Sequence, residues 1–189
     1  MGIFDFLKPK KKLSPEEVGE AIALVFGDQF VPKMQDYVRE FGGLPEITKQ
    51  RLNDLFHLYL MYWSTAISLE IELSDISDDD KKLLLDFFWN YIPEILRDCD
   101  REHNTLPNEI SSTFKRNTVS MYPKIRELLL RPPETFQSTI AFPRMIVQVA
   151  IPKWEVSEDS VDVLHKLMVD LYAIRIGVTE FVKESLEEL

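Results

Sequence analysis

Signals for the beginning of a helix recur along this chain and constrain its fold more than any other feature. Ser14 stands at an N-cap, Pro15 follows at the first helical position, and Glu17 completes the pattern of a capping box. Ser77 precedes three aspartates, whose negative charge is favoured where the helix dipole is positive. These patterns predict helices that begin at defined residues, and therefore an all-α fold.

Apolar residues recur at helical spacing after each start, until a glycine or a proline signals a stop. Gly42 and Pro132, each followed by a second residue of its kind, are the clearest stops. Prolines inside the pattern are expected to kink or interrupt helices, at Pro32, Pro93 and Pro123. We expect a single-domain bundle of about six or seven helices, several of them kinked at proline. The expected helical segments cover residues 15–31 and 33–41, 45 or 48–73, 78–92 and 94–102, 109–131, 134–152, and 157 or 160–189. The two segments on either side of Pro32, and likewise those on either side of Pro93, form one kinked helix or two helices.

Residues 134–152 form the one stretch that fits two structures. Their β-branched residues suit strands, and the segment MIVQVAI partly alternates between apolar and polar positions. A single strand would have nothing to pair with among helices, so we interpret the stretch as a proline-kinked helix and keep the strand as the alternative.

The longest uncharged run, Leu55–Leu69, predicts a buried helix. It has 15 residues, whereas a membrane-spanning helix needs roughly 18 to 20. The later stretch LLLDFFWNYI has only Asp86 and Asn90 as a polar stripe. Helices this apolar are surrounded by other helices or face a partner. The expected core aromatics are Trp63, Phe87, Phe88 and Trp89, and a homodimer is an alternative explanation for so much apolar surface.

Composition places the chain among ordinary globular proteins. Its 189 residues are 45% hydrophobic and 29% charged, enough for one domain with a substantial core. We expect that domain over residues 13–189, with residues 1–12 as an appended segment. The single cysteine, Cys99, predicts a reducing compartment, and the absence of a signal-peptide pattern predicts the cytoplasm.

Residues 1–12 combine an apolar half with a basic half. They hold four lysines against one aspartate, so the net charge of −10 for the chain leaves −13 on the remainder. Such a segment is expected to dock into a groove of the same chain or of a partner, to touch an anionic membrane surface weakly, or to serve as a solvated leader. The contact residues would be Ile3, Phe4, Phe6, Leu7, Lys8, Lys10, Lys11 and Lys12.

The negative charge of residues 13–189 also limits the classes of partner that the chain is expected to bind. A body of this charge is repelled by phosphate backbones, so we expect no nucleic acid. A protein partner with a basic surface fits better.

Motifs for catalysis and cofactor binding are lacking. The glycines form neither a dinucleotide-binding nor a phosphate-binding loop, and we expect no cofactor and no catalytic residue. Each histidine has an aspartate three residues earlier, a spacing that places both side chains on one helix face. Dimetal bundles use glutamate at that position, so we treat the pairs as weak metal-ligand candidates: Asp54 and His57, Asp100 and His103, and Asp162 and His165.

These observations favour a non-enzymatic, cytoplasmic, helical protein-interaction module of the adaptor, regulator or inhibitor type, with an acidic surface. The alternatives are a metal-dependent helical-bundle enzyme that uses the aspartate–histidine pairs, and a peripheral membrane adaptor that uses residues 1–12.

Overall fold

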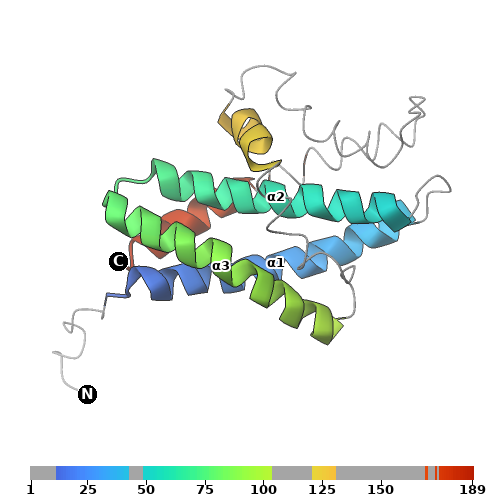
Figure 1. The fold of residues 1–189 in the computed structure, drawn as a ribbon, viewed down its shortest axis with the longest axis horizontal. Helices are drawn as coiled ribbons and strands as arrows, with labels where there is room; N and C mark the ends of the chain where they lie inside the picture. Colours follow the sequence, from blue (N-terminus) through green and yellow to red (C-terminus); the bar gives the residue numbers. More distant parts are fainter. Residues whose placement is uncertain (1–11, 43–48, 104–120, 131–168, 170–172, 174) are drawn as a thin grey trace.

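A computed structural model of the chain describes residues 12–42, 49–103, 121–130, 169, 173 and 175–189. This part contains five helices and no strand, which confirms the predicted helical class for the described residues. Three long helices are α1 (Pro15–Gly42), α2 (Lys49–Leu73) and α3 (Asp78–His103). Two shorter helical segments follow, over residues 121–130 and 175–186 (Figure 1). The expected structures of residues 109–120 and 131–168 lie outside the described residues.

The predicted capping residues begin α1 and α3. The backbone N–H of Ser14 donates to Glu17 Oε2 at 2.8 Å, and the N–H of Glu17 donates back to Ser14 Oγ at 3.2 Å. This reciprocal pair is the capping box that the sequence indicated. At α3, the N–H of Asp80 donates to Ser77 Oγ at 3.1 Å. Both contacts satisfy amide groups that have no partner inside the helix.

Of the two outcomes expected at Pro32 and Pro93, a break of the helix is wrong, and a kink stays a prediction. α1 continues through Pro32 to Gly42, and α3 continues through Pro93 to His103. An internal proline costs about 3 kcal/mol because it removes one hydrogen bond and crowds the preceding turn. Here each helix packs on the core before its proline, through Phe26 in α1 and Phe88 in α3. This packing stabilises the helical turns before the proline, and the helix continues beyond the proline.

A short connection joins α2 to α3 and makes them antiparallel neighbours (Figure 1). Ser74 ends α2 with two bonds to the carbonyl of Ile71, 3.2 Å from its backbone N–H and 2.7 Å from its hydroxyl. In Figure 1, α1 and α3 run in the same general direction and cross, while the 175–186 helix lies behind α3.

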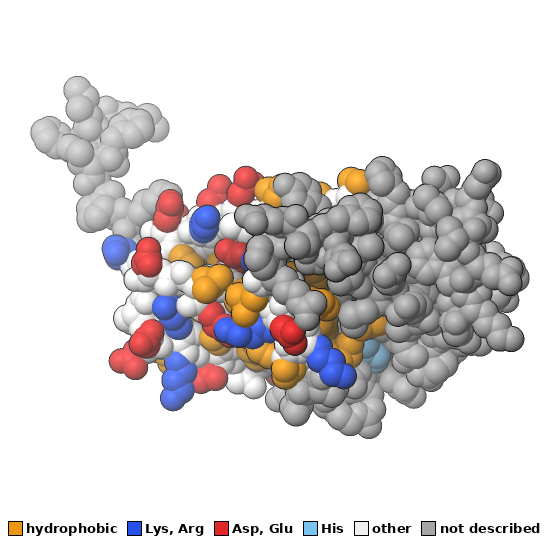
Figure 2. Space-filling model, turned by 90° about the horizontal axis from the view of Figure 1, so that it is seen from above, with side chains coloured by type: hydrophobic (Ala, Val, Ile, Leu, Met, Phe, Trp, Pro, Cys, Tyr) orange, Lys and Arg blue, Asp and Glu red, His pale blue; other side chains and the backbone are white. Residues whose placement is uncertain are grey.

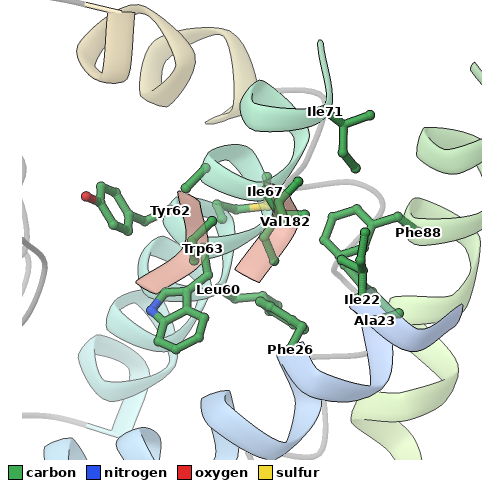
Figure 3. Packing of buried hydrophobic residues seen from close by; sticks show 14 of the residues in the cluster. Ile22, Ala23, Phe26, Leu60, Tyr62, Trp63, Ile67, Ile71, Phe88 and Val182 are labelled. Atoms are coloured by element: carbon green, nitrogen blue, oxygen red, sulfur yellow. The ribbon is translucent and has the colours of Figure 1, made fainter. Parts of the chain in front are cut away.

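The core lies between α1, α2, α3 and the 175–186 helix (Figure 3). Phe26 packs edge-on against both Trp63 and Phe88, with ring centroids 6.0 Å and 6.1 Å apart. One aromatic side chain of α1 therefore contacts α2 and α3 together. Burial of rings in this geometry contributes both apolar area and a favourable edge-to-face contact.

A glycine permits the close crossing of α1 and α3. A Cβ atom added at Gly19 would lie 3.0 Å from Phe87 Cβ and 3.4 Å from the carbonyl oxygen of Leu84. The helices approach so closely because Gly19 has no side chain.

The uncharged run in α2 is buried, as predicted. Every residue from Leu58 to Leu69 is buried, including the hydroxyl residues within that span. Ser64 Oγ donates to the carbonyl of Leu60 at 2.8 Å, and Thr65 Oγ1 donates to that of Met61 at 2.6 Å. These bonds to the preceding turn satisfy the hydroxyls without a partner on another helix. Among the described residues, no helix combines the length and the apolar character needed to cross a bilayer.

Candidate functional site

The residues predicted to contact a membrane or a partner lie mostly outside the described part. Only Lys12 of that set is described, and its side chain is exposed. Next to it, the backbone N–H of Leu13 donates to the carbonyl of Glu188 at 2.8 Å. This bond places the beginning of the described chain beside its end (Figure 1). Residues 1–12 therefore remain a predicted contact segment, and the described chain that follows them starts next to the last turn.

The structure does not bring the aspartate–histidine pairs together as a described site. Asp54 and His57 lie on α2, and Asp100 and His103 lie near the end of α3. Asp162 and His165 fall outside the described residues. Within the described part, no group of three or more His, Cys, Asp or Glu side chains is close enough together to hold a metal ion. Metal binding by these pairs stays a prediction.

Two glutamates near the end of α2 hold the shorter helical segments in place. Glu70 Oε1 lies 2.6 Å from Arg175 Nη2, and the same guanidinium donates to the carbonyl of Ala66 at 3.3 Å. Glu72 accepts the Tyr122 hydroxyl at 2.6 Å.

Arg126 completes the second of these clusters. Its Nε and Nη2 atoms lie 3.1 Å and 2.9 Å from Glu72 Oε2. Burial, together with the contact to Glu72, raises the pKa of Tyr122 above its ordinary value. Sequence reasoning missed both clusters; their signal is a pair of glutamates, two residues apart, directly after the long uncharged run.

One face of α3 exposes apolar and acidic side chains side by side. Leu83 is 40% exposed and Phe87, one turn later, is 36% exposed. Asp86 and Asn90, the predicted polar stripe, are exposed on the same side of the helix. We call these four residues the α3 stripe. The expectation that Phe87 belongs to the core is wrong, because the contact of its Cβ with Gly19 leaves the ring at the edge of the helix crossing.

The other three predicted core aromatics pack as expected. Trp63 and Phe88 are buried, and Trp89 is partly buried against the core. Trp89 also contacts the ring of Tyr122, with centroids 5.7 Å apart. The structure thus gives these three rings a packing role.

A pocket of about 410 Å³ opens between α1, α2 and the last helix. Phe26 and Trp63, whose rings meet edge-on, form part of its wall, and Lys33 contributes a positive charge. Gly177 lies on the opposite segment, where an added Cβ would meet nothing within 4 Å. The remaining lining residues are Val25, Gln29, Ile67, Ala173, Val178 and Phe181. The pocket combines segments far apart in the sequence, so no local motif signalled it.

One face of the described part carries side chains of both charges. On the face shown in Figure 2, acidic and basic side chains are interspersed, and apolar side chains reach the surface between them. The expected acidic surface stays a prediction.

Comparison with known proteins gives no relative from which a function could be transferred: no protein-family model, curated protein or solved structure matches the chain.

Proposed function

We propose that this chain is a non-catalytic protein-interaction module, and that the α3 stripe is the surface that binds its partner. The observation that supports the proposal is the exposure of Leu83 and Phe87 on successive turns of one helix. Apolar side chains at this spacing suit the apolar face of a partner helix. In Figure 1, α3 lies at the front of the molecule, and no described helix covers its outer side.

The charge beside these residues favours a basic partner. Asp79 and Asp86 are exposed on this side of α3, and neither forms an ion pair within the described part of the chain. A partner helix with leucine-like residues one turn apart and flanking lysines or arginines would contact both the apolar and the acidic members of the surface. Two copies of the stripe facing each other would instead bring Asp86 carboxylates together, which disfavours a homodimer through this face.

The proposal includes the wider organisation expected from the sequence. We infer one domain of six or seven helices, with residues 1–12 as a basic appendage and a cytoplasmic location. The single cysteine and the acidic composition support this interpretation.

A designed peptide tests the proposed surface. The probe is a labelled amphipathic helical peptide with leucines four residues apart and lysines beside them. We expect wild-type protein to bind it in fluorescence anisotropy, and binding to weaken with salt because screening reduces the charge term. The double variant Leu83→Asp/Phe87→Glu should bind at least about tenfold more weakly, since it removes both apolar contacts.

The matched control replaces two other apolar residues of similar exposure, Leu130→Asp and Ile176→Glu. Circular dichroism checks that both double variants remain folded. Equal peptide binding by the α3 variant and wild type would contradict the proposal. So would sedimentation data in which wild type is a dimer and the α3 variant a monomer, because the stripe would then be a self-interface.

A further inference from the structure

The α3 stripe lies beside the first turns of α1. A Cβ atom added at Gly19 would lie 3.0 Å from Phe87 Cβ, so the stripe borders the crossing of the two helices. α1 and α3 run in the same general direction (Figure 1), and Leu83 therefore lies one turn nearer to the start of α1 than Phe87 does. The exposed apolar pair is close to the point where residues 1–12 join the described part of the chain.

Only a short length of chain separates the apolar residues of the 1–12 segment from this surface. Leu13 is held by its hydrogen bond to the carbonyl of Glu188. The six residue steps from Leu7 to Leu13 span up to about 20 Å when extended. Gly19, which marks the position of the stripe, lies about 6 Å along α1 from its first residue, Pro15. The apolar residues can therefore reach the stripe while α1 stays in place.

The charges around the stripe are opposite to that of the segment. Residues 14–20 and 77–87 together hold seven carboxylates and two lysines, a net charge of −5, whereas residues 1–12 carry +3. Glu20 is exposed on the side of α1 that faces α3, because its Oε1 accepts the Tyr91 hydroxyl at 3.1 Å. Opposite charges attract at this range, and salt screens the attraction.

The segment also has the chemistry expected above of a partner for the stripe. Phe4 and Leu7 are apolar residues three positions apart, and four lysines follow between positions 8 and 12. A covalent tether of this length gives a binding segment an effective concentration in the millimolar range. A contact too weak to hold a free peptide can therefore be well populated within one chain.

From these features we propose that residues 3–12 of the same chain occupy the α3 stripe and compete there with the partner. Phe4 and Leu7 pack on Leu83 and Phe87, and the lysines lie beside the carboxylates of α1 and α3. Because the contact uses the surface assigned above to a partner, it rests on the proposed function and adds its regulation. The partner binds only the fraction of molecules in which the segment has left the stripe, so its apparent affinity is lowered by that fraction.

The designed lysine-flanked helical peptide tests the competition in the full chain. Phe4→Ser/Leu7→Ser should bind it about tenfold more tightly than wild type, because the segment loses its apolar contacts and frees the stripe. This variant changes no charge, so a gain in affinity cannot come from the net charge of the protein. The matched control, Leu130→Ser/Ile176→Ser, removes two exposed apolar side chains elsewhere and should keep the wild-type affinity.

Photocrosslinking tests the contact directly. With p-benzoylphenylalanine at position 6 of the full chain, we expect mass spectrometry to find crosslinks within residues 79–91. Crosslinks only at other places, such as the exposed Leu73 at the end of α2, or none at all, would overturn the assigned surface. In a mixture of unlabelled and isotopically labelled protein, crosslinks between unlike chains would show that the segment occupies a second copy and would overturn the intramolecular contact.

The two experiments separate this contact from the function on which it rests. Equal peptide affinity of wild type and Phe4→Ser/Leu7→Ser, with binding lost in Leu83→Asp/Phe87→Glu, would overturn the competition and leave the proposed function standing. Failure of the peptide to bind any of these proteins would contradict the proposed function, and the crosslinks would then decide the self-contact alone.

Discussion

Arg175 Nη2 lies 2.6 Å from Glu70 Oε1, in a pair whose side chains are 26% and 12% exposed. The arginine comes from the last helix and the glutamate from α2. Gly177, Val178 and Phe181, which line the pocket, lie within two turns of this arginine. The ion pair therefore positions the helix that forms one wall of this pocket.

We expect a strong energetic coupling in this pair because both charges are largely removed from water. A double-mutant cycle with Glu70→Gln and Arg175→Met, measured by urea unfolding, should give about 1–3 kcal/mol. The control is the pair Lys81 and Asp78, 3.7 Å apart with a fully exposed aspartate. Surface pairs of that kind couple by about 0–0.5 kcal/mol. Similar couplings in the two cycles would contradict the role assigned to Arg175.

Two helical glycines are expected to respond oppositely to alanine. At Gly19 a Cβ would meet Phe87 Cβ at 3.0 Å, so Gly19→Ala should force α1 and α3 apart and lower the free energy of unfolding by about 1–3 kcal/mol. At Gly177 an added Cβ would have no neighbouring atom within 4 Å. Gly177→Ala should stabilise the protein by about 0.5–1 kcal/mol, because alanine has the higher helix propensity. Chemical denaturation measures both changes, and a stabilising Gly19→Ala would contradict the close crossing.

Removal of the N-cap of α1 should destabilise the protein. Ser14→Ala leaves the N–H of Glu17 without its acceptor and should cost about 1 kcal/mol. Ser14→Asp keeps a capping oxygen and should cost much less. Thermal unfolding of the two variants compares their stabilities directly. An equal loss of stability in both would contradict a stabilising role of the hydrogen bond to Ser14 Oγ.

Stability should fall at alkaline pH through Tyr62. Burial raises the pKa of this phenol from 10.0 to about 12, an effect that nearby Arg175 partly offsets. The folded state therefore keeps a proton that the unfolded state loses first. The contribution of protonated Tyr62 to the free energy of unfolding is fully present below pH 10 and is lost as the pH rises through 12.

The loss attributable to Tyr62 is at most about 3 kcal/mol, at about 1.4 kcal/mol per pKa unit. Denaturant unfolding at pH 8 and at pH 11 should show a smaller decline for Tyr62→Phe than for wild type. Parallel declines in the two proteins would contradict this account.

The sequence predicted the local structure of the described part well. The Ser14 and Ser77 caps and the described span of α2 follow from local signals. Helix propensity and capping act within one or two turns, so a linear sequence contains them. The burial of α2 also follows, because an uncharged helix of that length requires cover on nearly every side.

Only the tertiary structure decided the rest. The continuity of α1 and α3 through Pro32 and Pro93 depends on packing that outweighs the local cost of a proline. The exposure of Phe87 depends on where α1 crosses α3. That close crossing is possible because Gly19 of α1 has no side chain. The pocket joins residues more than 100 positions apart. Such a pocket depends on how distant helices pack together, which local signals in the sequence do not specify.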